Sequence, residues 1–233
     1  MVDYTYSPHF QYTHDNPYHH RLQEYAHFVL RDREGEDFKG RWNHDVFQRT
    51  APLAVEIGSG YGEFMAEYCR DNPEVNFVGM DYRFKRSFGL ARRLDASNPN
   101  KNFRYLRAKG ERLEHLFAPN EIDRMFYFFP DPWPRPRQHK KRLFCDHFLN
   151  LAYEIMGPGG KIYIKTDHDD YALWMKKAIE RQSKFKLDFH SQDLRHEYPE
   201  HFLSRYITKF ETIFIAKGTK IKAFVLSSTK ELC

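Results

Sequence analysis

The chain has 233 residues, of which 41% are hydrophobic and 17% aromatic, and this apolar content excludes wholesale disorder. Charged residues make up 30% of the chain, and the formal net charge of +5 favours an acidic partner if the cations gather on one face. The length fits one large α/β domain, with or without an added arm, and leaves too little room for two full domains.

Cysteine spacing and the N-terminal sequence indicate the cellular compartment. Cys69, Cys145 and Cys233 form no CxxC pair, so neither a zinc site nor a disulfide framework is expected. The start, MVDYTYSPHF, lacks the basic and apolar parts of a signal peptide, and no apolar run reaches the ~18 residues of a membrane span. We expect a soluble cytoplasmic protein.

The first part of the chain is rich in Tyr, His and Asp and shows little periodicity before LQEYAHFVL, which is predicted as a short amphipathic helix. The cluster of His14, His19 and His20 has no acid or cysteine at metal-ligand spacing, so a solvated polar arm is favoured over a metal site. We therefore expect an N-terminal arm over residues 1–50 and one larger domain over residues 51–233.

Beyond the arm, predicted strands and helices alternate. Strands are expected over residues 53–58, 75–81, 102–108, 122–129, 161–167 and 185–190. Helices are expected over residues 62–72, 83–97, 110–117, 143–156 and 169–182. Residues 206–216 and 220–228 are predicted to form a closing antiparallel hairpin. The alternation predicts an α/β, Rossmann-like fold with a doubly wound, mostly parallel seven-stranded sheet, whose ligands bind at the carboxyl ends of the strands.

The segment EIGSGYG follows the first of these strands and contains Glu56, Gly58, Gly60 and Gly62. Glycines permit positive φ and let a ligand approach the backbone closely. A GxGxxG dinucleotide fingerprint would place its last glycine where Glu63 stands. Because a carboxylate at that position repels a pyrophosphate, NAD and FAD are disfavoured.

The spacing ExGxGxG resembles motif I of class I S-adenosylmethionine (AdoMet) methyltransferases. AdoMet carries a sulfonium and an ammonium but no phosphate, so an acid suits it. Asp81 ends the second strand, where a carboxylate can accept both ribose hydroxyls. The residues expected to bind AdoMet are Glu56, Gly58, Gly60, Gly62, Asp81 and Tyr82.

The sequence FFPDPWPRPRQHKKRL begins at Phe128, at the end of a predicted strand. Pro130 and Pro132 fix φ on both sides of Asp131 and remove two N–H donors, so the Asp131 carboxylate is expected to point in one direction. On the proline pattern alone, a stiff turn with a solvated basic face would be the favoured interpretation.

Cations gather around this loop. They are Arg135, Arg137, His139, Lys140, Lys141 and Arg142 in the loop, and Lys85, Arg86, Arg92 and Arg93 in the helix predicted over residues 83–97. Such a concentration at one edge of the sheet implies a polyanionic substrate, most simply nucleic acid. Trp133 offers a face on which a base can stack.

The loop resembles the signature of the tRNA (guanine-N7-)-methyltransferase family, which runs roughly FPDPW-x-K-x-R-H-x-K-R-R. EIGSGYGEF and TDHDDYA support the match, and RYITKFE resembles the family's R-x-x-TKFE motif. The resemblance spans about residues 51 to 215, and the PDPW and TKFE motifs are highly specific as a pair.

The resemblance implies transfer of a methyl group from AdoMet to N7 of a guanosine in tRNA, guanosine 46 of the variable loop. This chemistry requires no metal, and no membrane partner is expected. Asp131 is implied as the catalytic or guanine-positioning acid, and Arg135 stands at a substrate-contacting lysine of the family. The substrate-binding residues implied are Trp133, Arg135, Asp167, Thr208, Lys209, Phe210 and Glu211.

The chain also departs from the family pattern. Lys109 stands where the family carries Asp or Asn near the adenine, and Gln138 replaces the first histidine of the loop. Two other functions stay open: an exocyclic-amine methyltransferase, because DPW superficially resembles (D/N)PP(Y/F), and a non-catalytic or partner-dependent tRNA-binding protein. Whether the protein is a monomer or a homodimer is also open.

Overall fold

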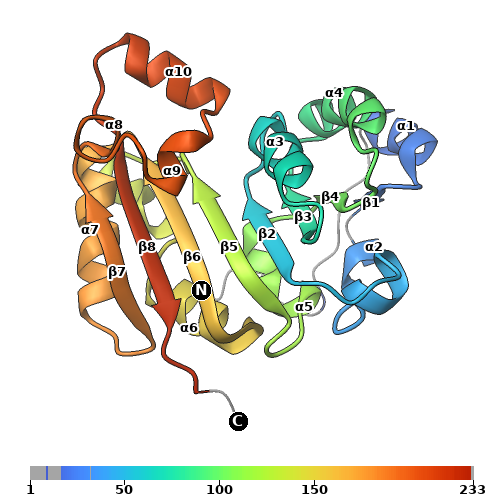
Figure 1. The fold of residues 1–233 in the computed structure, drawn as a ribbon, viewed down its shortest axis with the longest axis horizontal. Helices are drawn as coiled ribbons and strands as arrows, with labels where there is room; N and C mark the ends of the chain where they lie inside the picture. Colours follow the sequence, from blue (N-terminus) through green and yellow to red (C-terminus); the bar gives the residue numbers. More distant parts are fainter. Residues whose placement is uncertain (1–8, 10–16, 32, 232–233) are drawn as a thin grey trace. The chain divides into compact units, whose positions relative to one another are not determined.

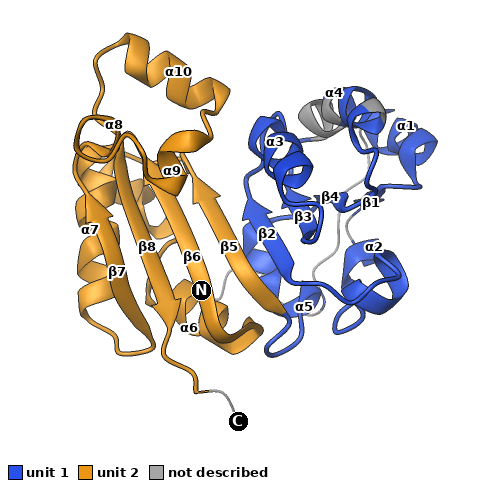
Figure 2. Ribbon diagram, viewed as in Figure 1, with its two compact units in different colours: residues 1–121 blue, residues 122–233 orange. Residues whose placement is uncertain are grey.

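The computed structural model describes His9 and residues 17–31 and 33–231, with only the backbone described at residues 84–87, 90 and 96. The chain forms two compact units, residues 1–121 and residues 122–233 (Figure 2). Each unit has its own strands and helices.

The first unit contains four strands: β1 (Val29–Arg31), β2 (Leu53–Ile57), β3 (Asn76–Met80) and β4 (Phe103–Arg107). They lie in the order β1-β4-β3-β2 and pair in parallel. Every residue of β2 and β3 is buried, as expected for parallel strands covered on both faces. A Cβ on Gly79 of β3 would lie 2.4 Å from the Met65 sulfur, so the sheet packs closely there.

Helices surround these strands (Figure 1). The α-helices are α1 (Pro17–Arg21), α2 (Arg33–Glu36), α3 (Glu63–Asp71), α4 (Phe84–Leu94) and α5 (Leu113–Leu116). Other helical turns are η2 (Leu22–Tyr25), η3 (Trp42–Val46), η4 (Asp95–Ser97) and η5 (Gly110–Arg112).

Part of the predicted arm is built into the first unit. LQEYAHFVL does not form the predicted amphipathic helix, because η2 gives way to β1, which pairs with β4 at Val29 and Tyr105. β1 thereby covers an edge of β4 that would otherwise expose unpaired backbone groups. Trp42 is fully buried and donates from Nε1 to the Leu116 carbonyl at 2.8 Å. The boundary near residue 50 stays a prediction of domain organisation.

The second unit contains β5 (Ile122–Phe128), β6 (Met156–Thr166), β7 (Phe185–Ser191) and β8 (Lys222–Ser228), in the order β5-β6-β8-β7. β5 and β6 are parallel, whereas β8 runs antiparallel to β6 and β7. The helices are η6 (Pro136–Lys141), α6 (Asp146–Ile155), α7 (Asp169–Glu180), α8 (Leu194–Glu197), α9 (Phe202–Arg205) and α10 (Lys209–Ala216). α8, α9 and α10 lie at the end of this sheet toward which β5 points (Figure 1).

The predicted mostly parallel α/β fold with antiparallel C-terminal strands is confirmed, and β1 is an eighth strand within the described residues. One strand of the predicted closing hairpin is wrong. Residues 206–216 hold α10, and β8 pairs with β6 and β7 instead. Thr208 caps this helix by accepting from the Glu211 backbone N–H at 3.2 Å, in the Thr-x-x-Glu pattern of a capping box.

Candidate functional site

The glycine turn after β2 adopts the conformation that its sequence predicts. Gly58, Gly60 and Gly62 have φ of 81°, 57° and 69°, in the left-handed region that favours glycine. The backbone N–H groups of Gly58 and Ser59 both donate to the Met80 carbonyl at 2.8 Å. The turn is therefore fastened to the end of β3, and Gly62 is the N-cap of α3.

Two buried acids lie at the carboxyl ends of β2 and β3. Glu56 is 3% exposed and Asp81 is 7% exposed. Asp81 accepts from the Gly60 N–H at 3.2 Å and from the Arg83 N–H at 2.9 Å, one with each carboxylate oxygen. Asp81 thus ties the glycine turn to the segment after β3.

Tyr82 follows Asp81 and lies among cations from the end of β4. The Arg107 guanidinium is 4.5 Å from the centre of the Tyr82 ring, and the Lys109 ammonium is 4.9 Å from it. Lys109, where the family carries an acid or amide, therefore contacts a residue expected to bind the cofactor. These contacts are close enough for cation–π attraction, which restricts the orientation of the ring.

The loop after β5 has an unusual backbone. Phe129 and Trp133 have φ of 48° and 46°, which is uncommon for bulky side chains. Between them lies Asp131, whose side chain is exposed. Trp133 is half-buried, with the Lys141 ammonium 4.6 Å from its ring centre, so the indole is already in contact with one loop cation.

The loop cations divide into two groups. Arg135, Arg137, Lys140 and Lys141 are exposed, as an RNA-binding role requires. Arg142 is not: its side chain is 0% exposed and contacts Asp170 at 2.5 Å. The expectation that Arg142 belongs to the basic RNA-facing surface is therefore wrong for this structure. The side chains of Lys85 and Arg86 lie outside the described residues, whereas Arg92 and Arg93 on α4 are exposed.

Asp167 follows β6, and its side chain is half-buried. Burial raises the pKa of Asp167, although its own backbone N–H and the nearby His168 act in the opposite direction. Lys222 of β8 donates to the Asp167 carbonyl at 3.1 Å and fixes the backbone at this point. Asp167 thus has a partly desolvated carboxyl group, and its backbone carbonyl is fixed by Lys222.

The TKFE residues have two different environments. Lys209 and Phe210 are exposed on α10, and Thr208 is half-buried at its cap. Glu211 is fully buried and pairs with the fully buried Lys165 of β6 at 2.5 Å. The structure therefore places the Glu211 carboxylate inside the second unit, whereas its three neighbours in the motif lie nearer the surface.

A second cation completes the environment of Glu211. Arg195 of α8 donates from Nε to Glu211 Oε1 at 2.8 Å and also pairs through Nη2. Lys165 donates in addition to the Tyr206 carbonyl at 2.8 Å. Neither Lys165 nor Arg195 was expected from the sequence, because nothing local to either residue indicates a buried partner on α10.

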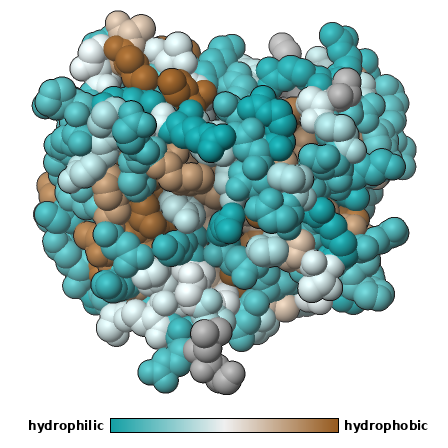
Figure 3. Space-filling view, in the orientation of Figure 1, coloured by the Kyte–Doolittle hydropathy of each residue, from teal (hydrophilic) through white to brown (hydrophobic). Residues whose placement is uncertain are grey.

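α10 exposes an unusual number of apolar side chains. Ile207 before the helix and Phe210, Ile213 and Ile215 within it are each at least 38% exposed. Figure 3 shows apolar side chains gathered over α10 on the face in view. Only Glu211 of this helix is fully buried, so α10 is fastened mainly through its charged residue.

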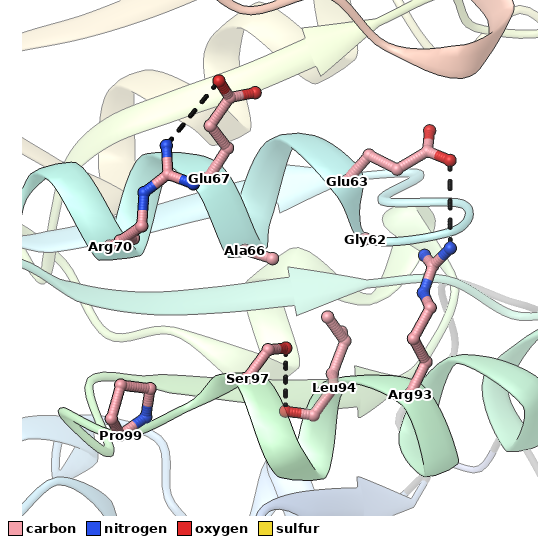
Figure 4. Close-up of a pocket in the computed structure, with 9 residues that line it drawn as sticks. All are labelled: Gly62, Glu63, Ala66, Glu67, Arg70, Arg93, Leu94, Ser97 and Pro99. Atoms are coloured by element: carbon pink, nitrogen blue, oxygen red, sulfur yellow. Dashed lines mark hydrogen bonds and ion pairs between the residues drawn. The ribbon is translucent and has the colours of Figure 1, made fainter.

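The first unit also carries a groove of about 610 Å³ beside α3 (Figure 4). Its lining residues are Gly62, Glu63, Ala66, Glu67, Arg70, Arg93, Leu94, Ser97 and Pro99. Its charged residues already pair, with Arg93 and Glu63 3.9 Å apart and Arg70 and Glu67 3.8 Å apart. Glu56 and Asp81 do not line it, so the groove is separate from the acids expected to hold the cofactor.

The described part of the chain shows neither a metal site nor a membrane span. No group of three or more His, Cys, Asp or Glu side chains there is placed to hold a metal ion. His14 lies outside the described residues, and the rings of His19 and His20 are 5.6 Å apart. No helix among the described residues has the length and apolar character to cross a membrane.

Comparison with known proteins places the chain in a family. A family model described as "Putative methyltransferase" matches residues 50–224. The tRNA (guanine-N(7)-)-methyltransferase of Bdellovibrio bacteriovorus is 36% identical over 85% of this chain and 94% of that protein. The enzyme of the same name from Bacillus subtilis is 32% identical over 79% and 84%. A solved 16S rRNA methyltransferase, KamB, shares the fold, with a TM-score of 0.59 at 13% identity over 85% of this chain and 94% of that one. The chain therefore belongs to the tRNA (guanine-N(7)-)-methyltransferase family.

Proposed function

We propose that this protein transfers a methyl group from AdoMet to N7 of a guanosine in tRNA, and that the target is guanosine 46 of the variable loop. The observation that carries the proposal is the loop after β5, where an exposed Asp131 lies between two prolines and is followed by exposed cations. Relatives that carry the name tRNA (guanine-N(7)-)-methyltransferase support this substrate and this position on the base.

The residues of the first unit fit AdoMet. The turn of Gly58, Gly60 and Gly62 lets a ligand approach the backbone, and the adjacent acids suit a cation that carries no phosphate. We assign Asp81 to the ribose hydroxyls and Glu56 to the amino end of the cofactor. Bound AdoMet supplies a methyl group on a positively charged sulfur.

The chemistry requires placement rather than a strong base. Guanine N7 has an in-plane lone pair and no proton, so it attacks the methyl carbon directly as the carbon–sulfur bond breaks. The base becomes positively charged as the bond forms. An exposed carboxylate such as Asp131 accepts a hydrogen bond from the guanine edge and offsets this charge, which is stabilisation of the transition state by a fixed group.

The remaining residues of the second unit would bind the tRNA. Arg135 and the exposed cations of η6 suit the phosphate backbone, and Trp133 offers an aromatic surface to a base. We assign Asp167, Thr208, Lys209 and Phe210 to the target nucleoside. Glu211 is buried, so we give it the role of holding α10 and the residues that the helix carries. Cytoplasmic location stays a prediction.

The test is mass spectrometry of nucleosides from tRNA incubated with purified protein and AdoMet. We expect 7-methylguanosine to appear. N6-methyladenosine in its place would identify an exocyclic-amine methyltransferase. If no methylated nucleoside forms although calorimetry shows that AdoMet and tRNA both bind, the protein is non-catalytic or needs a partner subunit.

A further inference from the structure

Arg142 has a different environment from the other cations of its loop. Lys140 and Lys141 are exposed, but the Arg142 side chain is 0% exposed. A buried guanidinium is costly unless partners inside the protein satisfy it. The groups that contact the Arg142 guanidinium therefore indicate its structural role.

The guanidinium bridges two segments of the second unit. Its Nε donates to the Pro132 carbonyl at 2.8 Å, and its Nη2 donates to Asp170 Oδ2 at 2.5 Å. Its central carbon lies 4.9 Å from the ring centre of Tyr171 and 5.1 Å from that of Trp174. The hydrogen bond from Arg142 also lowers the pKa of Asp170, which favours the ionised partner. Arg142 thus fastens the loop after β5 to the first turn of α7.

The backbone that Arg142 holds is strained. Phe129 and Trp133 are both in the left-handed region, which is unfavourable for bulky side chains, and such conformations persist only where neighbours enforce them. The Phe129 N–H donates to the Lys165 carbonyl at 2.8 Å, which fixes the start of the segment on β6. The Pro132 carbonyl is held by Arg142 at the other side of Asp131. The turn that presents Asp131 is therefore fixed before and after this residue.

We propose that Arg142 is a positioning residue for methyl transfer: through the Pro132 carbonyl and Asp170 it holds the strained turn that presents Asp131, and it does not bind tRNA phosphate. The proposal rests on the function proposed above. Lysine is a poor substitute because the contact uses two donors of one planar fork, which an ammonium cannot reproduce with the same geometry.

Arg142→Lys tests positioning and Arg142→Gln tests RNA binding, because lysine loses the planar fork but keeps a charge that can contact phosphate. A misplacement of about 1 Å costs about 100-fold in rate, so we expect kcat to fall about 10- to 100-fold while the Kd for tRNA and its salt dependence stay those of the wild type. Lys140→Gln, an exposed cation of the same loop, should instead lower the slope of log Kd against log salt by about 0.9. Lys177→Gln on the exposed side of α7 should change neither quantity. Arg142→Gln removes the charge as Lys140→Gln does, and we expect it to leave the salt dependence at the wild-type value. If Arg142→Gln flattens the salt dependence as Lys140→Gln does, Arg142 binds phosphate and the proposal is wrong.

Limited trypsin digestion, without tRNA or AdoMet, tests independently of activity whether Arg142 holds the loop through Pro132 and Asp170. Trypsin cleaves after Arg137, Lys140 and Lys141, and Arg142→Lys leaves these sites intact, so a loosened loop should be cut several times faster than in the wild type. Unchanged cleavage together with unchanged kcat would refute the proposal. If the wild type transfers no methyl group, the proposed function fails. Faster cleavage of the variant would still show that Arg142 holds the loop.

Asp170→Asn provides a second variant, since Asp170 is half exposed and its amide should be tolerated by the fold. The amide oxygen can still accept from Arg142 but lacks the charge, so we expect a smaller loss of kcat, about three- to tenfold, with faster cleavage of the loop. In the double variant with Arg142→Lys, Asp170→Asn should lower kcat little further, because both substitutions disrupt the same contact between Arg142 and Asp170. Full additivity of the two losses would contradict a shared role.

Discussion

Glu211→Ala tests whether α10 is held by the buried charges described for the second unit. The substitution removes the carboxylate that pairs with Lys165 and Arg195. Lys165 and Glu211 are both 0% exposed, so Lys165 would be left as a buried charge without its counter-ion, whereas Arg195 is partly exposed and can be solvated. We therefore expect the main cost to come from Lys165.

The expected loss of stability follows from the burial of Lys165 and Glu211. Removal of one partner from a buried ion pair costs about 3–5 kcal/mol of unfolding free energy. For a domain of this size each kcal/mol lowers Tm by about 2–4 °C, so Glu211→Ala should lower Tm by roughly 6–20 °C. Glu211→Gln keeps an acceptor for Lys165 and should cost less, about 1–3 kcal/mol.

The assay is urea or thermal unfolding of the purified variants, followed by far-ultraviolet circular dichroism. Glu67→Ala is the matched control, because its carboxylate forms an exposed pair with Arg70 at 3.8 Å and its removal should change stability by no more than about 0.5 kcal/mol. The double variant Lys165→Met with Glu211→Leu removes both buried charges and should recover much of the loss. A Glu211→Ala protein within about 1 kcal/mol of the wild type would refute the buried network.

Three further changes test the proposed roles. Asp131→Ala should lower methyl transfer about 100- to 1,000-fold and leave AdoMet affinity intact by calorimetry; an equal loss of AdoMet affinity would assign Asp131 to the cofactor. Asp81→Ala should weaken AdoMet binding about 10- to 100-fold without changing the Kd for tRNA, and a normal AdoMet affinity would contradict its assignment to the ribose. Burial raises the pKa of Asp167, so its contribution to stability is present at low pH and is lost as pH rises through the folded-state pKa. Asp167→Asn should therefore have a higher Tm than the wild type at pH 7 and lose this advantage in acid, and a Tm difference independent of pH would exclude a desolvated carboxylate.

The parts of the fold that depend on local pattern could be predicted from the sequence. The apolar run ending at Ile57 predicts a buried strand, and β2 is buried throughout. The glycine spacing predicts positive φ at Gly58, Gly60 and Gly62, as observed. Asp81 was expected at the end of the second strand of the larger domain and lies directly after β3. These features follow from backbone sterics and from burial on both faces of a parallel sheet.

α10 was missed because its composition favours a strand. The run TIFIA is apolar and contains β-branched residues, which indicate β-structure. The competing signal was the Thr-x-x-Glu spacing of Thr208 and Glu211, in which Thr208 caps the helix and which predicts the start of a helix. The buried ion pair of Glu211 with Lys165 then holds the helix in place, and its apolar side chains remain exposed.

The roles of the charged residues were the least predictable. In the basic loop, Lys140, Lys141 and Arg142 are adjacent and chemically similar, yet only Arg142 among these three is buried. Its partner Asp170 lies on α7, and only the tertiary fold brings the two together. The same holds for β1, whose partner strand β4 is distant in sequence. Pairings between distant segments leave no local pattern.

The most direct test of the central claim uses AdoMet with a deuterated methyl group and two tRNA substrates. One is unmodified, and the other carries 7-deazaguanosine at position 46, which replaces the attacking nitrogen by a C–H group and leaves the rest of the base in place. After digestion and mass spectrometry, we predict labelled 7-methylguanosine from the first tRNA and no labelled nucleoside from the second. Labelled N6-methyladenosine, or equal labelling of both tRNAs, would contradict methyl transfer to N7 of that guanosine.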